Sequence, residues 1–161
     1  MFLSPFGLAG HLYIRYYSFM VIYIAISIAL IVPVLFLLLL DRFDLFQTGK
    51  NYINIATLLC GGVAYYFAAL INPAMISAGW ATRSQVIQIT APILEELLKS
   101  LILIVLVTRA DFNYVVDGAI YGFGAGIGFA MIENVQYITD NPEIALSLAI
   151  ARVFSTNLVH A

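Results

Sequence analysis

The chain has 161 residues, of which 63% are hydrophobic and only 10% are charged. Soluble domains carry about a quarter of their residues as Asp, Glu, Lys or Arg, so this composition indicates an integral membrane protein and excludes an ordinary soluble domain. The formal net charge is -2, and the seven basic residues are spread singly along the chain. This distribution forms no basic patch, so the expected surroundings are the lipid bilayer and no nucleic acid is expected as a partner.

Four apolar stretches are long enough to cross a bilayer, which takes about 20 residues in a helix. The connections between them are short and polar, which favours antiparallel neighbours in one helical bundle and leaves no room for a soluble domain. We therefore predict an all-α, polytopic membrane bundle formed by residues 1–161 as one domain. The predicted spans are Ser18–Leu40, Ile55–Ser77, Gln85–Val107 and Gly118–Ile138.

The segment after the fourth span does not read as a simple membrane helix, because Arg152 lies in its middle. We predict an interfacial or re-entrant helix from Pro142 to about Val153, followed by a new span that starts near Ser155. Seven residues cannot complete that span, so we expect the sequence to be the N-terminal part of a longer protein.

The third predicted span contains three charged residues, Glu95, Glu96 and Lys99. A charge near the bilayer centre costs about 2.5–3.5 kcal/mol, so this cluster must face protein or trapped water. Lys99 is able to pair with Glu95 at i,i+4 or with Glu96 at i,i+3, and it cannot neutralise both. The pair alone is as compatible with a structural role as with a catalytic one, but the remaining carboxylate indicates a functional site.

The fourth span combines a glycine stripe with a buried polar pair. Gly118, Gly122 and Gly126 recur every fourth residue, a pattern that allows another helix to approach closely. At about 100° per residue, Glu133 lies on the same face as this stripe, so close packing should bring Glu133 to a helix interface. Asn134 beside it also needs a protein partner.

Distances along the helices allow Glu96 and Glu133 to reach a common depth in the membrane. At about 1.5 Å per residue, Glu96 lies roughly 18 Å from Ser84 and Glu133 roughly 10 Å from Asp140, and antiparallel helices bring both ends to one side. A span starting near Ser155 would put His160 at a depth closer to that of Glu96 and Glu133.

Taken in order, these residues resemble the PrsW family of intramembrane proteases. The resemblance is carried by Glu95-Glu96-x-x-Lys99, by the glycine-rich helix that begins Asp117-Gly118 and ends Phe129-x-x-x-Glu133-Asn134, and by Arg152 and His160. It covers about Thr90 to Ala161, whereas Ser18 to Trp80 matches only as generic membrane helix. In the related group of CAAX-prenyl and bacteriocin-processing endopeptidases an Arg would stand at Ser100 and a His at Glu133, so the PrsW-like assignment is the closer one.

The resemblance implies a peptidase of the bacterial plasma membrane that cleaves membrane-anchored protein substrates, of which anti-sigma factors are the best-known class. It also implies further spans after the histidine. The sequence has neither His-Glu-x-x-His nor Gly-x-Ser-x-Gly, which excludes the usual zincin helix and a serine nucleophile elbow.

Peptide hydrolysis needs a base that activates water and a group that stabilises the developing oxyanion. A carboxylate removed from water is a better base near neutral pH, so Glu96 or Glu95 is the expected base, with Glu96→Gln as the first variant to test. We expect Glu133 and His160 to orient the water or stabilise the intermediate. Supporting roles fall to Lys99, Asn134 and Arg152.

The chemistry leaves two alternatives open. Glu95, Glu96, Glu133 and His160 are equally suited to hold zinc with one position left for water, while the prenyl endopeptidase resemblance favours metal-free glutamate chemistry. A different class of function also fits buried carboxylates: a non-enzymatic membrane protein or transporter fragment that binds protons or cations. A transporter of that kind would be expected to show two related halves, which the sequence lacks.

Overall fold

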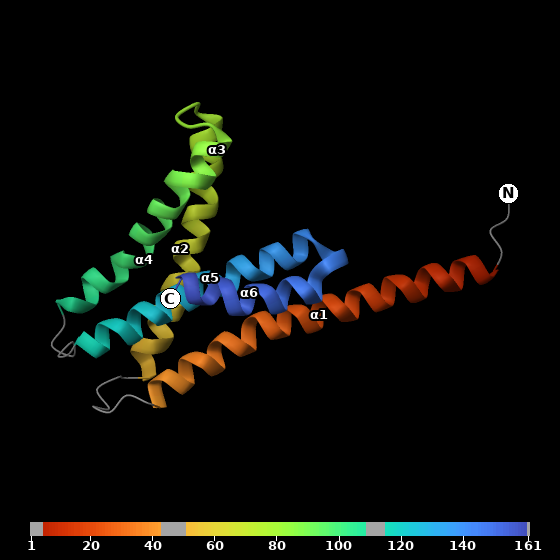
Figure 1. Cartoon of the computed structure of the whole chain (residues 1–161), viewed down its shortest axis with the longest axis horizontal. Helices are drawn as coiled ribbons and strands as arrows, with labels where there is room; N and C mark the ends of the chain where they lie inside the picture. Colours follow the sequence, from red (N-terminus) through yellow and green to blue (C-terminus); the bar gives the residue numbers. More distant parts are fainter. Residues whose placement is uncertain (1–4, 43–50, 109–114, 161) are drawn as a thin grey trace.

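The computed structural model describes residues 5–42, 51–108 and 115–160, and every regular element within these ranges is helical. This confirms the predicted all-α class. Helix α5 lies at the centre of the fold and contacts α1, α2, α4 and α6. Figure 1 shows α1, α5 and α6 running alongside one another, with α2 and α4 leading away from them to the turn that holds α3. The elements are α1 (Pro5–Arg42), α2 (Asn51–Ser77), α3 (Arg83–Gln85), the π-helix η1 (Val86–Thr90), α4 (Ala91–Val107), α5 (Val115–Asp140), the 3-10 turn η2 (Pro142–Ile144) and α6 (Ala145–His160).

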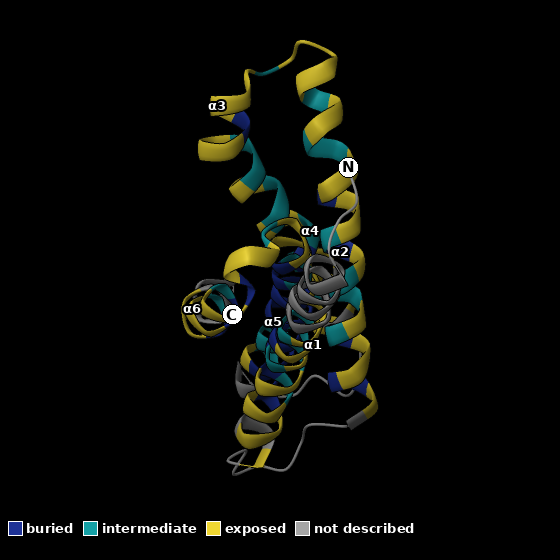
Figure 2. Ribbon diagram, turned by 90° about the vertical axis from the view of Figure 1, so that its right-hand side faces the viewer, coloured by how far each residue is buried: buried dark blue, intermediate teal, exposed yellow. Residues whose placement is uncertain are grey.

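Two helices in the described part of the chain are long and apolar enough to cross a membrane. They are Phe19–Leu39 within α1, with a mean hydropathy of 2.9, and Tyr52–Ser77 within α2, with a mean hydropathy of 1.6. Only 22% of the most apolar stretch of the first helix and 33% of that of the second is buried in the protein. Most of this apolar surface therefore faces outward, as it does in lipid-facing helices. Figure 2 shows buried residues concentrated on α5 and exposed residues on the surrounding helices.

The other two predicted spans, which correspond to α4 and α5, are helical, but length and composition alone do not identify them as membrane-crossing helices. Helix α4 has 17 residues, fewer than the roughly 20 that a straight crossing needs. Helix α5 has 26 residues, but its glycines and the polar pair Glu133-Asn134 lower its apolar character. Length and composition therefore identify two of the four predicted spans.

The break predicted near Ser155 is wrong, because α6 is one continuous helix, Ala145–His160, that packs against α1 and α5. The prediction relied on the cost of an arginine within an apolar helix. In the structure the Arg152 guanidinium donates hydrogen bonds to Glu133 and Asn134 of α5. Because the charge of Arg152 is compensated by Glu133, the arginine is compatible with an uninterrupted helix.

The start of the third predicted span is irregular. The π-helix η1 precedes α4, and the N–H of Ala91 donates to the carbonyl of Val86, five residues back. Pro92 follows directly; a proline lacks an N–H, and its ring collides with the carbonyl four residues earlier in a regular helix. The wider π turn gives that ring room, and single π turns are frequent at functional sites.

The crossing of α2 and α5 depends on glycines from both helices. A Cβ atom at Gly128 would lie 1.9 Å from the carbonyl oxygen of Leu58, and one at Gly61 would lie 1.9 Å from the carbonyl oxygen of Ala125. Both neighbours are backbone atoms, which cannot turn aside as a side chain does. The two backbones are therefore in direct contact, the arrangement that small residues permit between membrane helices.

The glycine row at 118, 122 and 126 lies next to this contact. Gly126 is buried, and a Cβ at Gly122 would meet the side chain of Leu103 on α4 at 3.7 Å, an ordinary contact distance. The tightest approach to α2 is instead at Gly124 and Gly128, where a Cβ at Gly124 would lie 2.4 Å from Oγ1 of Thr57.

Gly128→Ala and Gly122→Ala are expected to change stability in opposite directions. Gly128→Ala forces the helices apart and should lower the free energy of unfolding by about 1–3 kcal/mol, the usual cost of overpacking. Gly122→Ala meets no backbone and should be neutral or stabilising by up to about 1 kcal/mol, because alanine favours the helix. Unfolding of both variants in detergent micelles measures the difference. Equal stabilities would contradict a backbone contact at Gly128.

Candidate active site

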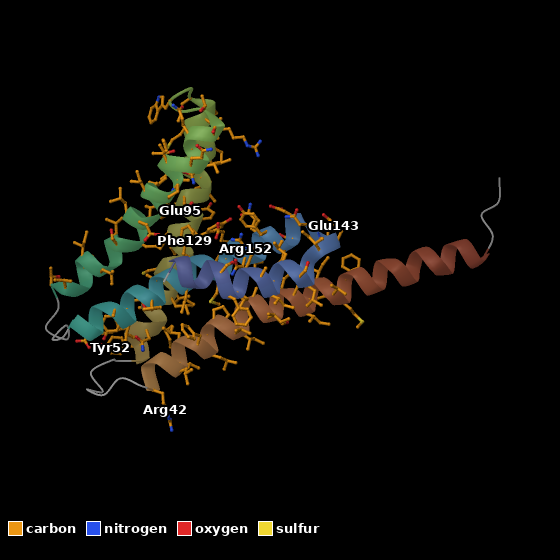
Figure 3. All side chains as sticks on the ribbon, in the orientation of Figure 1. Arg42, Tyr52, Glu95, Phe129, Glu143 and Arg152 are labelled. Carbon is orange, nitrogen blue, oxygen red and sulfur yellow. The ribbon has the colours of Figure 1, made fainter. Side chains whose placement is uncertain are left out.

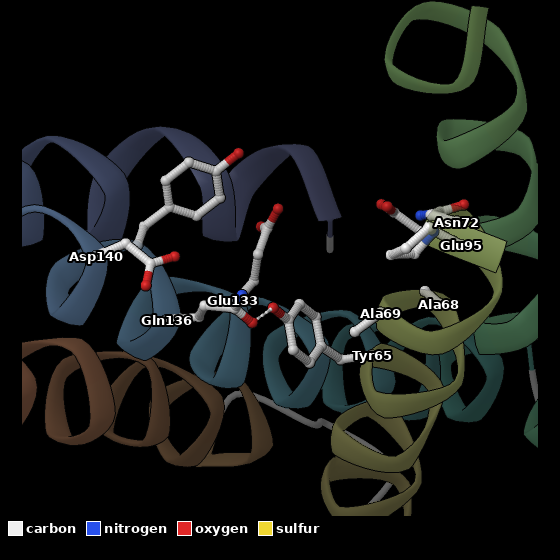
Figure 4. Close-up of a pocket in the computed structure, with 10 residues that line it drawn as sticks. Tyr65, Ala68, Ala69, Asn72, Glu95, Glu133, Gln136 and Asp140 are labelled. Carbon is white, nitrogen blue, oxygen red and sulfur yellow. Dashed lines mark hydrogen bonds between the residues drawn. The ribbon is translucent and has the colours of Figure 1, made fainter. Parts of the chain in front are cut away.

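Glu95 of α4 and Glu133 of α5 line the same two adjoining cavities, of about 380 Å³ and 600 Å³. The smaller cavity extends from these carboxylates along α2 and α5, and the larger one extends toward η1 and the start of α4. Figure 4 shows Glu133 pointing from α5 into the smaller cavity, with Glu95 on the side formed by α2 and α4. Five residues line both cavities: Asn72, Pro73, Glu95, Glu133 and Tyr137.

The adjacent glutamates have different surroundings. Glu96 lines neither cavity, its side chain is 65% exposed, and its Oε1 lies 2.5 Å from Nζ of Lys99. The Lys99 side chain is only 6% exposed, and its ammonium group also lies over the ring of Phe129, 4.6 Å from the centroid. Lys99 thus links the outward carboxylate of α4 to the packed face of α5, while Glu95 faces the cavities.

Glu133 is held by Arg152, which reaches it from α6. The Arg152 guanidinium donates one hydrogen bond to Oε2 of Glu133 and one to Oδ1 of Asn134, each at 2.8 Å. Both charged side chains are 17% exposed, and the guanidinium carbon lies 3.8 Å from the centroid of the Tyr137 ring. The three contacts fix the guanidinium, and with it one oxygen of Glu133. Figure 3 shows Glu95, Phe129 and Arg152 near the meeting of α2, α4, α5 and α6.

Helix α2 contributes cavity residues that sequence reasoning missed. Tyr65 and Asn72 line the smaller cavity, the Tyr65 hydroxyl donates to Oε1 of Gln136, and its ring packs edge-on against Phe129 with centroids 5.3 Å apart. A signal was present in the sequence, since residues seven apart share one face of a helix and a polar Asn within an apolar span is costly.

The donors for a metal ion are incomplete among the described side chains. Asn72 lines both cavities with Glu95 and Glu133, and its side-chain oxygen is buried and has no hydrogen-bond partner. These oxygens suit a cation, but the described residues contain no group of three or more His, Cys, Asp or Glu side chains able to hold one. His160 is the last residue of α6, and its side chain lies outside the described residues.

An apolar helical protein whose carboxylates line shared cavities between its helices belongs to the class of membrane proteins with an embedded polar site. The comparison with family models makes this specific: the model described as PrsW family intramembrane metalloprotease matches residues 50–161. The chain therefore belongs to the PrsW family of intramembrane metalloproteases. The match confirms the resemblance and extends it upstream of Thr90 to include α2.

Comparison with curated proteins found no match, and neither did comparison with solved structures.

Proposed function

We propose that this protein is an intramembrane endopeptidase that cleaves membrane-anchored protein substrates at the cavities between α2, α4 and α5. One observation carries the proposal: Glu95 and Glu133 come from different helices and line the same cavities within a chain that belongs to a protease family. The resemblance makes anti-sigma factors the first substrate class to test.

Glu95 is the proposed base. It takes a proton from the attacking water, whose oxygen adds to the scissile carbonyl carbon, and it then returns the proton to the departing amine. Glu133 accepts a hydrogen bond from Arg152 and is thereby held toward the cavity. His160 is proposed to complete the site from the end of α6.

The family description implies a metal ion, and the described side chains supply only part of the ligand set that one needs. Glu95, Glu133 and His160 would be its holders, and a bound zinc ion would supply Lewis acidity and a more acidic water. In that form of the proposal Glu95 is a ligand, and in the metal-free form it is the base. Both forms require Glu95.

The proposed setting is a multi-pass protein of the bacterial plasma membrane. In this arrangement α4 and α5 cross the bilayer together with α1 and α2, giving the four predicted spans. Exposed large apolar side chains on α4 and α5, including Leu97, Leu101 and Ile132, support contact with lipid.

The test is cleavage of a single-span reporter by the full-length protein in liposomes, with and without a chelator. We expect cleavage within the apolar segment of the reporter. Loss on chelation and recovery with added zinc would support the metal form, and unchanged cleavage would support the metal-free form. Absence of cleavage across a panel of reporters, together with cation or proton flux that depends on Glu95, would contradict the protease proposal.

A further inference from the structure

We propose that Asn72 and the carbonyl group of Ala69, both on α2, bind the main chain of an unwound peptide substrate through its N–H groups. The inference rests on the proposed protease function and assigns the part of the site that recognises the peptide backbone. None of the motif residues from the sequence analysis lies on α2.

The first observation is the unsatisfied oxygen of Asn72. It is buried and has no hydrogen-bond partner, a state that costs about 1–3 kcal/mol. Asn72 lines both cavities together with Glu95 and Glu133, as Figure 4 shows for the smaller one. Because Asn72 lines both cavities, we take them as the route by which a donor reaches this oxygen, beside the carboxylates.

The second observation is Pro73, inside the same helix. Proline has no N–H, so the carbonyl of Ala69, four residues earlier, does not receive its usual helical hydrogen bond. Ala69 and Pro73 both line the smaller cavity. In membrane helices such freed carbonyls are satisfied by neighbouring polar groups. We infer that the Ala69 carbonyl and the Asn72 oxygen, within one turn of α2, are acceptors available to a group that enters the smaller cavity.

A peptide cut inside a membrane supplies matching donors. Its N–H groups are bonded within its own helix until the helix unwinds around the scissile bond, and each freed N–H then lacks water in the bilayer core. Acceptors on the cavity wall satisfy these groups much as a sheet edge does when it binds an extended peptide. A zinc ion is a poorer occupant for Asn72, because zinc sites in proteins use His, Cys and carboxylate ligands.

The experiment measures binding without requiring cleavage. The full-length Glu95→Gln protein in liposomes is titrated with a fluorescent single-span reporter that contains a central Gly-Gly pair to ease unwinding. Adding Asn72→Leu is expected to raise Kd about tenfold, the effect of one hydrogen bond lost with its donor left unpaired. The matched control is Gln88→Leu, an exposed amide of η1 that lines neither cavity, and it should leave Kd unchanged.

A scan of the reporter with single ester bonds identifies the donor, because each ester removes one N–H. At one position the ester should weaken binding to the protein with Asn72 and have no further effect on the Asn72→Leu protein, since the two changes remove the same contact. If Asn72→Leu does not fold, Asn72→Ala is used, with the same expected loss.

The outcomes separate the two proposals. Equal Kd values with and without Asn72, or ester effects that do not depend on residue 72, would overturn this inference. A wild-type protein that binds the reporter through Asn72 without ever cutting it would overturn the protease proposal and leave this inference standing.

Discussion

Glu95→Gln is expected to lower the rate of reporter cleavage by about 10²–10⁴-fold, the usual contribution of a positioned general base. The neighbouring variant Glu96→Gln is the matched control, since it makes the same chemical change one residue further along α4. Glu96 is 65% exposed and lines neither cavity. Glu96→Gln removes one partner of the buried Lys99 ammonium, which lowers stability, but Glu96 lines neither cavity, so the cleavage rate of the folded protein should stay close to that of wild type.

Initial rates in liposomes, normalised to the amount of folded protein, measure this contrast. Active Glu95→Gln protein would remove Glu95 from both forms of the proposal. A reversed pattern, with Glu96→Gln inactive and Glu95→Gln active, would return the base to Glu96 and would mean that α4 turns its other face to the substrate.

The sequence was sufficient to predict the helical class and the position of two helices long and apolar enough to cross a membrane, because both depend on local composition. Ser18–Leu40 and Ile55–Ser77 differ by only a few residues from the apolar segments Phe19–Leu39 and Tyr52–Ser77. The family was also recognisable from the order and spacing of a few charged residues, which helical periodicity preserves.

The choice between Glu95 and Glu96 was not accessible from the sequence. Adjacent residues in a helix are rotated by about 100°, so only one of them faces a given neighbouring helix. Which one does so depends on where α2 and α5 lie around α4. For Asn72 the sequence holds a signal, a polar residue within an apolar span, but not its place beside Glu95 and Glu133, which depends on a cavity formed by three helices.

The prediction for α6 failed for a related reason. An arginine in an apolar helix is costly alone, and the sequence does not show that Glu133 and Asn134 lie opposite Arg152. The partners are 18 and 19 residues away in the sequence. They meet because η2 turns the chain back so that α6 packs along α5.

Arg152→Met is expected to lower the free energy of unfolding by about 3–5 kcal/mol, because it leaves the largely buried Glu133 without the guanidinium. It should also abolish cleavage, since Glu133 is no longer held. Adding Glu133→Gln to this variant removes the carboxylate charge that the guanidinium had balanced. The double variant should therefore recover much of the lost stability while remaining inactive. Unfolding in mixed detergent micelles and cleavage in liposomes measure the two effects separately.

Arg152→Lys tests whether geometry or charge matters at this position. The guanidinium bonds Glu133 through one nitrogen and Asn134 through another while it lies against the Tyr137 ring. An ammonium group carries the same charge as a single point and cannot reproduce this planar arrangement. Arg152→Lys should thus be more stable than Arg152→Met but still impaired in cleavage. Full activity in Arg152→Lys would mean that only the charge is needed, and full activity in Arg152→Met would show that Glu133 does not depend on Arg152 for its position.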